Sequence, residues 1–312
     1  MTDREPLVSI VIPCFARTAE DERLLDEALG TVDSQTCRAY EVVVVDDGSP
    51  RDLESTVRAH ARTRLIRQPN AGSAAARNAG IAASWGSQFI FLDADDHLLP
   101  VAVETGLAQL DAHPECGFVV GPHEEMTYDG AAVPWQVPVP PPGGDIYHAL
   151  LRFEWIIIPP SSAMFRREAV LTVTGFQDPW GADDLDFYLR VARRYEAWCY
   201  QSPAVTRYRR YSASSSRDGE RMLRSIRAVY DRQWPMVEHS KAGREAFRTG
   251  LSRLVDIFTD CLVENTTDRV RARNWRGAAR AVAMLAREQP RKLFPALALA
   301  LARDSRRTAV RA

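Results

Sequence analysis

Residues 89–100, FIFLDADDHLLP, join a short apolar run to a cluster of carboxylates. The run FIFL shows no alternation with polar residues, which is typical of a strand covered on both faces, as in a parallel sheet. Asp93, Asp95 and Asp96 follow at once. Like charges this close repel one another unless a cation or hydrogen-bond donors compensate them, and oxygen ligands on a loop suit a hard divalent cation. A solvated acidic turn that caps the next helix is the alternative interpretation of these three residues alone.

The first 120 residues repeat this strand-and-helix pattern. Similar apolar runs predict further strands at residues 7–12, 41–45, 64–67 and 117–120. Helical patterns fill the gaps at residues 21–33, 73–84 and 100–110. Repeated βα units favour a doubly wound α/β domain, with a mostly parallel, Rossmann-like sheet and flanking helices. Ligands of such sheets bind beyond the carboxyl ends of the strands, so we expect the acidic residues after two of these strands to converge on one cleft.

The composition is that of an ordinary globular protein. The chain has 312 residues, of which 46% are hydrophobic and 26% charged, enough for a substantial core without disulfides. No apolar run reaches the roughly 18–20 residues of a membrane-spanning helix, and the N-terminal segment carries acids where a secretory signal needs basic and apolar residues. Five cysteines without a CxxC pair favour neither a zinc site nor a disulfide scaffold. The expected location is the cytoplasm.

Two turns at predicted strand ends carry further candidate residues. In residues 68–81, QPNAGSAAARNAGI, Gly72 permits an unusual backbone turn, and Arg77 has a planar guanidinium that suits phosphate oxygens. A packed alanine-rich helix with a surface arginine is the alternative. In residues 46–49, DDGS, a carboxylate could accept from a base or ribose hydroxyl, or the turn could be an Asx turn before the next helix. Neither a dinucleotide-binding fingerprint nor a Walker A sequence is present.

Five segments in register resemble the family 2 glycosyltransferases, which have the GT-A fold. They are VSIVIPCF (8–15), EVVVVDDGS (41–49), PNAGSAAARNAGI (69–81), FIFLDADDHLLP (89–100) and GFQDPWGADDLDFYLR (175–190). The resemblance covers about residues 6–215. It implies a GT-A catalytic domain over residues 1–215, with a nucleotide-sugar-binding half at about 6–120 and an acceptor-binding half at 121–215. A helical region follows at 216–312.

The resemblance assigns the donor nucleotide to residues near the first three strands. Asp47 would contact the nucleoside, with Pro13 and Phe15 near its base. Arg77 matches the family's arginine in the glycine-asparagine segment and would lie near the nucleotide or its phosphates.

The resemblance also assigns the cation and the chemistry. Asp93-Ala94-Asp95 matches the family's DxD motif, so Asp95 would bind Mn²⁺ or Mg²⁺ through the donor diphosphate, and Asp93 would contact the ribose or the metal. The pair Asp183-Asp184 matches the family's acidic pair before a late helix. Asp184 would be the catalytic base, which takes the proton of the attacking hydroxyl. Attack by this route needs one carboxylate and no covalent intermediate, so inversion is expected.

The acceptor pocket would be bordered by Trp180, Gly181 and Asp183. Aspartate at the first acidic position, where the family usually has glutamate, has a shorter reach. Stabilisation of a helix N-terminus is the alternative role for the acidic pair.

The predicted activity is that of an inverting, metal-dependent glycosyltransferase. It would move a sugar from a nucleotide donor, expected to be a UDP-sugar, to a hydroxyl of a glycan, a lipid-linked glycan or a small molecule. A sugar-phosphate nucleotidyltransferase is the competing enzyme class, but it should carry a glycine- and arginine-rich loop where this chain has PCFARTAED. A catalytically inactive nucleotide-sugar-binding or membrane-scaffold protein is the competing class without activity.

One corner of the site departs from the family. Tyr211 stands where many relatives have a histidine that binds the metal, and tyrosine is a weak ligand at neutral pH. Metal coordination at this corner is therefore open. Arg207, Arg209 and Arg210 could hold phosphate oxygens instead, or could form an exposed basic strand edge.

Positive charge is concentrated at the C-terminus. The net charge is −1, but residues 269–312 carry 12 basic and 2 acidic residues with apolar residues between them. A basic amphipathic helix can lie on an anionic membrane, here the inner face, while a helical bundle with a solvated arginine face is the alternative and is compatible with it. No nucleic-acid-binding motif accompanies the charge, so no nucleic-acid partner is expected. The sequence leaves the oligomeric state open.

Overall fold

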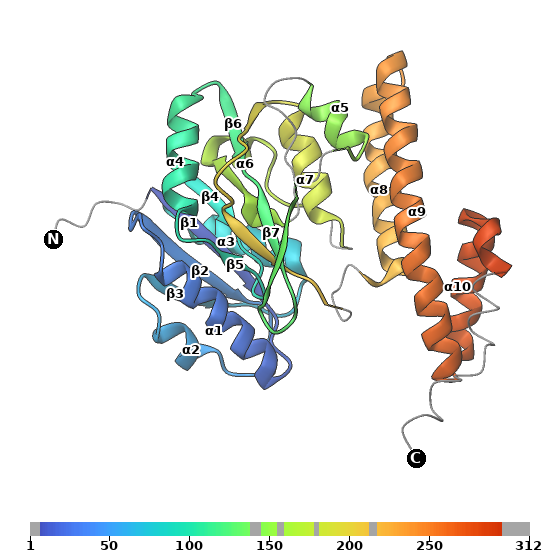
Figure 1. Cartoon of the computed structure of the whole chain (residues 1–312), viewed down its shortest axis with the longest axis horizontal. Helices are drawn as coiled ribbons and strands as arrows, with labels where there is room; N and C mark the ends of the chain where they lie inside the picture. Colours follow the sequence, from blue (N-terminus) through green and yellow to red (C-terminus); the bar gives the residue numbers. More distant parts are fainter. Residues whose placement is uncertain (1–6, 138–144, 155–158, 178–180, 212–216, 295–312) are drawn as a thin grey trace. The chain divides into compact units, whose positions relative to one another are not determined.

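The computed structural model describes residues 7–137, 145–154, 159–177, 181–211 and 217–294. The chain divides into two compact units, Met1–Tyr211 and Ser212–Ala312, each described here by itself (Figure 1). Trp180, one of the predicted acceptor residues, lies outside the described residues.

A seven-stranded sheet forms the centre of the first unit, in the order β10-β6-β9-β4-β1-β2-β3. Its strands are β1 (Val8–Cys14), β2 (Tyr40–Asp46), β3 (Thr63–Arg67), β4 (Gln88–Phe91), β6 (Cys116–Val120), β9 (Ala163–Arg166) and β10 (Glu196–Cys199). All of them are parallel except β9, which is antiparallel to both of its neighbours. The mostly parallel α/β sheet predicted from the apolar runs is confirmed.

Helices cover both faces of this sheet because its central strands are apolar on both sides. One face packs against α1 (Ala19–Asp33), α2 (Glu54–Arg58) and α4 (Ala102–Ala112). The other face packs against α3 (Ser73–Ala83) and α7 (Asp183–Ala192). Two short helices, α5 (Ile146–Leu151) and α6 (Arg167–Thr172), and a 3₁₀ turn at Pro160–Ser162 complete the described connections. This arrangement brings the start of α3 and the start of α7 to the carboxyl edge of the strands.

A second, four-stranded sheet follows the acidic turn. Its order is β5-β11-β7-β8, formed by β5 (His97–Leu98), β11 (Thr206–Arg209), β7 (His123–Met126) and β8 (Ala132–Val137). Part of the proline-rich stretch at residues 121–144 forms the β7–β8 hairpin. Pro134 fits there because β8 is an edge strand, where a missing N–H costs no ladder bond. Since β5 begins directly after Asp96, β11 lies beside the acidic turn.

The described part of the second unit is helical, as the sequence predicts. It consists of α8 (Gly219–Val237), α9 (Lys241–Arg271), α10 (Trp275–Glu288) and a 3₁₀ turn at Pro290–Lys292. Aliphatic side chains from the three helices form a common core, made of Leu223, Val255, Leu262, Ala281 and Leu285. Within the ranges described above, no helix is both long and apolar enough to span a membrane.

The close contact of α3 with the sheet depends on Gly80. A Cβ added there would lie 2.3 Å from Val11 Cγ1 and 3.3 Å from Val45 Cγ2. We therefore expect Gly80→Ala to lower the free energy of unfolding by about 1–3 kcal/mol, measured by urea denaturation. Gly30→Ala in α1 is the matched control, because nothing lies within 4 Å of its added Cβ and alanine is the better helix former. Equal stability of the Gly80 variant and the wild type would contradict the prediction.

Candidate functional site

Arg77, on α3, links the acidic turn after β4 to the start of α7. Its side chain is 6% exposed, and its guanidinium forms ion pairs with Asp93, at 2.7 Å between Nη2 and Oδ1, and with Asp183. Asp183 also accepts a hydrogen bond of 3.3 Å from Ser73 Oγ. One buried cation thus joins carboxylates that are 90 positions apart in the chain. The alternative of a surface arginine on an alanine-rich helix is wrong, because Arg77 points into the site.

Asp184 lies in the first turn of α7, next to this ion-pair network. It is half-buried, and its Oδ1 accepts from the backbone N–H of Leu185 at 2.7 Å. Burial raises the pKa of Asp184 to about 7, and the negative charge of Asp183 contributes, while the charge of Arg77 opposes the rise. A carboxyl group that titrates near neutral pH can accept a proton during a reaction and release it afterwards.

The turn after β4 holds more negative charge than the protein compensates. Burial and the neighbouring charge of Asp93 raise the pKa of Asp95. Asp96 is completely buried, its pKa is raised well above the usual value mainly by burial, and its Oδ2 has no hydrogen-bond partner. Such a set of oxygens fits a divalent cation, which would relieve the repulsion. Across the described ranges, no three ligating side chains form a complete cluster, so a cation here would also take oxygens from a ligand.

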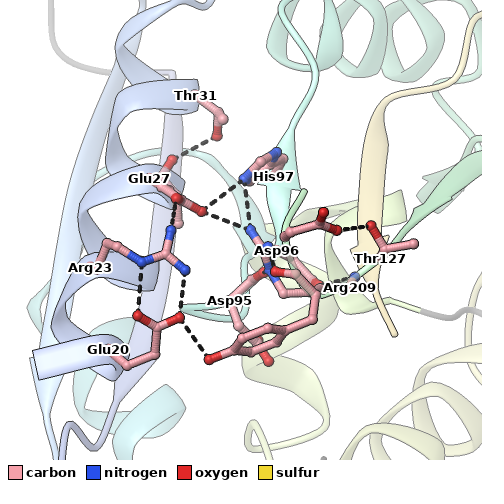
Figure 2. Close-up of polar contacts among 12 residues, drawn as sticks. Glu20, Arg23, Glu27, Thr31, Asp95, Asp96, His97, Thr127 and Arg209 are labelled. Atoms are coloured by element: carbon pink, nitrogen blue, oxygen red, sulfur yellow. Dashed lines mark hydrogen bonds and ion pairs between the residues drawn. The ribbon is translucent and has the colours of Figure 1, made fainter. Parts of the chain in front are cut away.

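The residues around β11 hold this turn from the other side (Figure 2). Arg209 is completely buried, donates from Nε to the backbone carbonyl of Asp95 at 2.7 Å and forms an ion pair of 2.9 Å with Glu27. Tyr211 donates its hydroxyl hydrogen to Asp95 Oδ2 at 2.7 Å. Both expectations for Arg209, a phosphate ligand or an exposed strand edge, are wrong because its guanidinium is buried and already bonded. Sequence reasoning missed these contacts, and the crowding of the aspartates was the only signal that donors must lie nearby.

The turn between β3 and α3 is shaped by Asp47. Its Oδ1 accepts from Gln68 Nε2 at 2.7 Å and from the N–H of Ala71 at 2.9 Å, and its Oδ2 accepts from the N–H of Gly72 at 2.8 Å. Gly72 has φ 91°, a conformation that glycine adopts readily. Asp47 therefore has a structural role at the start of α3 in addition to the nucleoside contact expected from the sequence.

The remaining predicted residues lie at the strand and helix ends. Pro13 is half-buried near the end of β1, and Phe15 beyond it has an exposed ring that can stack on a planar group. The guanidinium of Arg17 lies 4.9 Å from the centre of that ring. Gly181, with φ 129°, lies two residues before the start of α7. The structure thus brings Arg77, Asp93 and Asp183 into direct contact, while the other predicted residues that it describes lie at neighbouring strand ends, turns and the start of α7.

Comparisons with known proteins place this chain in a family. The model of the family described as glycosyl transferase family 2 matches residues 9–173. An uncharacterized glycosyltransferase of Bacillus subtilis, EpsJ, is 33% identical over 132 residues, which cover 39% of this chain and 37% of EpsJ. The protein MT1568 of Mycobacterium tuberculosis is 28% identical over 253 residues, 73% of this chain and 74% of its own. This chain therefore spans only about a third of EpsJ and three quarters of MT1568.

Solved structures show the same fold. Residues 1–349 of TarS from S. aureus superpose with a TM-score of 0.59 at 16% identity, over 94% of this chain and 87% of that one. The mannosyltransferase PcManGT from Pyrobaculum calidifontis, solved with GDP-Man and Mn²⁺, gives a TM-score of 0.57 at 20% identity, over 96% and 82%. The resemblance seen in the sequence motifs is confirmed. Because the family model matches more than half of the chain, this chain belongs to glycosyl transferase family 2, and it has the GT-A fold.

Proposed function

We propose that this enzyme transfers a sugar, with inversion, from a UDP-sugar to a hydroxyl of a glycan, a lipid-linked glycan or a small molecule, with Mn²⁺ or Mg²⁺. The observation that carries the proposal is the Arg77 bridge, which holds the turn of Asp93 and Asp95 beside the start of α7 and Asp184. TarS has been solved with UDP and with UDP-GlcNAc, and PcManGT with GDP-Man and Mn²⁺, which supports a nucleotide-sugar donor. Family membership argues against a nucleotidyltransferase.

The donor is proposed to bind across the carboxyl ends of β1, β2 and β4. Phe15 offers an exposed ring for the base, with Pro13 two residues before it in the chain, and Asp47 is proposed to contact the nucleoside. Arg77 is already bonded to two carboxylates. We therefore expect it to attract the diphosphate by long-range electrostatics and not by a direct hydrogen bond. Asp95, together with Asp93, would hold the cation, which when bound stabilises the charge of the leaving nucleoside diphosphate.

Asp184 is the proposed base. Asp183 is held by Arg77 and Ser73, whereas the Asp184 carboxyl accepts from the N–H of Leu185 and has a pKa of about 7. The acceptor hydroxyl would pass its proton to Asp184 as its oxygen attacks the anomeric carbon. Gly181 and Asp183, with Trp180, are proposed to border the acceptor pocket in the half of the domain formed by residues 121–215.

Binding of the donor can be tested without knowing the acceptor. UDP together with Mn²⁺ should raise the melting temperature more than either alone, since a ligand at a hundred times its Kd stabilises the folded state by about 2.7 kcal/mol. A thermal-shift panel of nucleoside diphosphates with Mn²⁺ or Mg²⁺ measures this. Asp95→Asn should lose the metal-dependent part of the shift. No shift with any nucleoside diphosphate would contradict donor binding.

Asp184→Asn should bind the donor but lose transfer by about 10²–10⁴-fold, because the base is gone. The base must be deprotonated, so kcat/KM of the wild type should rise with pH through about 7 and then level off. Because folding raises the pKa of this carboxyl from 3.8 to about 7, its contribution to the stability of the wild type is lost as the pH rises from about 4 to about 7 and stays lost above pH 7. The variant should therefore gain melting temperature relative to the wild type at alkaline pH and not at acidic pH.

Asp111→Asn, at an exposed position on α4, is the control for this comparison and should change neither turnover nor the pH profile. Wild-type turnover by Asp184→Asn would remove Asp184 from the mechanism.

The second unit is proposed to contact an anionic membrane surface from the cytoplasmic side. One face of α10 packs in the helical core through Ala278, Ala281 and Leu285. The exposed residues of this helix and the turn before it include four arginines, Arg273, Arg276, Arg280 and Arg287. Trp275 beside them is 63% exposed, and tryptophan favours the interface of a bilayer. Such contact would suit an acceptor carried on a lipid.

Vesicle cosedimentation tests this contact. The intact chain should sediment with phosphatidylcholine vesicles only when they contain phosphatidylglycerol, and less so at high salt. Replacing Arg276, Arg280 and Arg287 together by glutamate should abolish sedimentation, whereas the same change at Lys241 and Arg248, exposed on α9, should not. An intact chain that ignores anionic vesicles would contradict the proposal.

A further inference from the structure

Two residues of the segment Arg209–Tyr211 hold Asp95, and neither has a role in the proposed reaction. The backbone carbonyl of Asp95 accepts from Arg209 Nε at 2.7 Å. One oxygen of its carboxylate, Oδ2, accepts from the Tyr211 hydroxyl at 2.7 Å. Main chain and side chain of the same aspartate are therefore fixed by residues two positions apart.

The tyrosine is itself supported. Its ring packs against Tyr128, with ring centres 5.4 Å apart. The hydroxyl of Tyr128 donates to Glu20 Oε1, at the start of α1, at 2.7 Å. The Tyr211 ring thus packs against a residue that is bonded to α1. This contact restricts where the Tyr211 hydroxyl can lie.

Arg209 anchors the same segment. Its Nη2 pairs with Glu27 at 2.9 Å and lies 3.1 Å from His97 Nε2, and its backbone N–H donates to Asp96 Oδ1 at 2.9 Å (Figure 2). Because the guanidinium of Arg209 is completely buried, water can replace its hydrogen bonds only if the structure around it opens. Tyr211 follows Arg209 by two residues, so the firmly held arginine also restrains the position of the tyrosine.

We propose that Tyr211 is a positioning residue for the donor site: by occupying Oδ2 of Asp95, its hydroxyl orients the carboxylate and leaves Oδ1 for a divalent cation and the diphosphate it accompanies. The inference rests on the proposed function. A phenol at neutral pH is a hydrogen-bond donor and a poor metal ligand, so Tyr211 acts through Asp95. An aspartate whose rotation is already restricted loses less freedom when the cation binds.

Tyr211→Phe removes the hydroxyl and keeps the ring. We expect it to weaken Mn²⁺ binding in the presence of UDP by about tenfold, which corresponds to the loss of one hydrogen bond to a charged group. Isothermal titration calorimetry measures this affinity, and KM for the donor should rise by more than kcat falls. The melting temperature without ligands should stay near that of the wild type, because the ring contact with Tyr128 remains.

Tyr195→Phe is the matched control. It also removes one hydroxyl, which pairs with the hydroxyl of Thr172 at 2.9 Å, and it should leave the Mn²⁺ affinity unchanged. Equal Mn²⁺ affinity of Tyr211→Phe and the wild type would overturn the positioning role while the proposed function stands. Equal loss in both variants would overturn it as well, because the effect would not depend on Asp95. A wild type that binds no nucleoside diphosphate with Mn²⁺ would overturn both.

Discussion

The ion pairs of Arg77 with Asp93 and Asp183 determine where the site lies. Burying a charged pair adds little net stability, because desolvation offsets the attraction, but removal of one partner leaves an unpaired charge and is strongly unfavourable. The bridge therefore acts mainly on arrangement, because it ties the first turn of α7 to α3 and to the turn after β4. That constraint also places Asp184, the next residue, within the electric field of the acidic turn, which contributes to its raised pKa.

Two buried arginines divide the negative charge of the site between them. Arg77 compensates Asp93 and Asp183, and Arg209 compensates Glu27 while binding the turn at Asp95 and Asp96. The carboxyls left over have raised pKa values, so this edge of the sheet is less stable than it would be with neutral side chains. Such local destabilisation is common at binding sites, where charged groups stay uncompensated until a ligand binds. The apolar strands beneath the turn supply the compensating stability.

The sequence predicted those parts of the site whose signal is local. Apolar runs mark the strands, and an acid directly after a strand must lie at its carboxyl end, which is why Asp47 and Asp93 could be placed. Arg209 could not be placed, because RYRR offers similar arginines whose burial depends on how β11 pairs with β5 and β7. Its partner Glu27 is 182 positions away, and no local pattern encodes that contact. The Tyr211 bond to Asp95 spans 116 positions and was missed for the same reason.

Charge balance explains why the cation and the donor should bind together in the proposed reaction. Residues 1–216 contain 19 basic and 30 acidic residues, so an anionic nucleotide meets a repulsive field that salt only partly screens. Arg77 already pairs with two carboxylates, and Arg209 is buried with partners of its own, so the charge of both arginines is compensated within the site. In the proposed reaction, positive charge would therefore arrive with the donor, as a metal complex. A turn of preoriented, uncompensated carboxylates suits that complex better than either of its components alone.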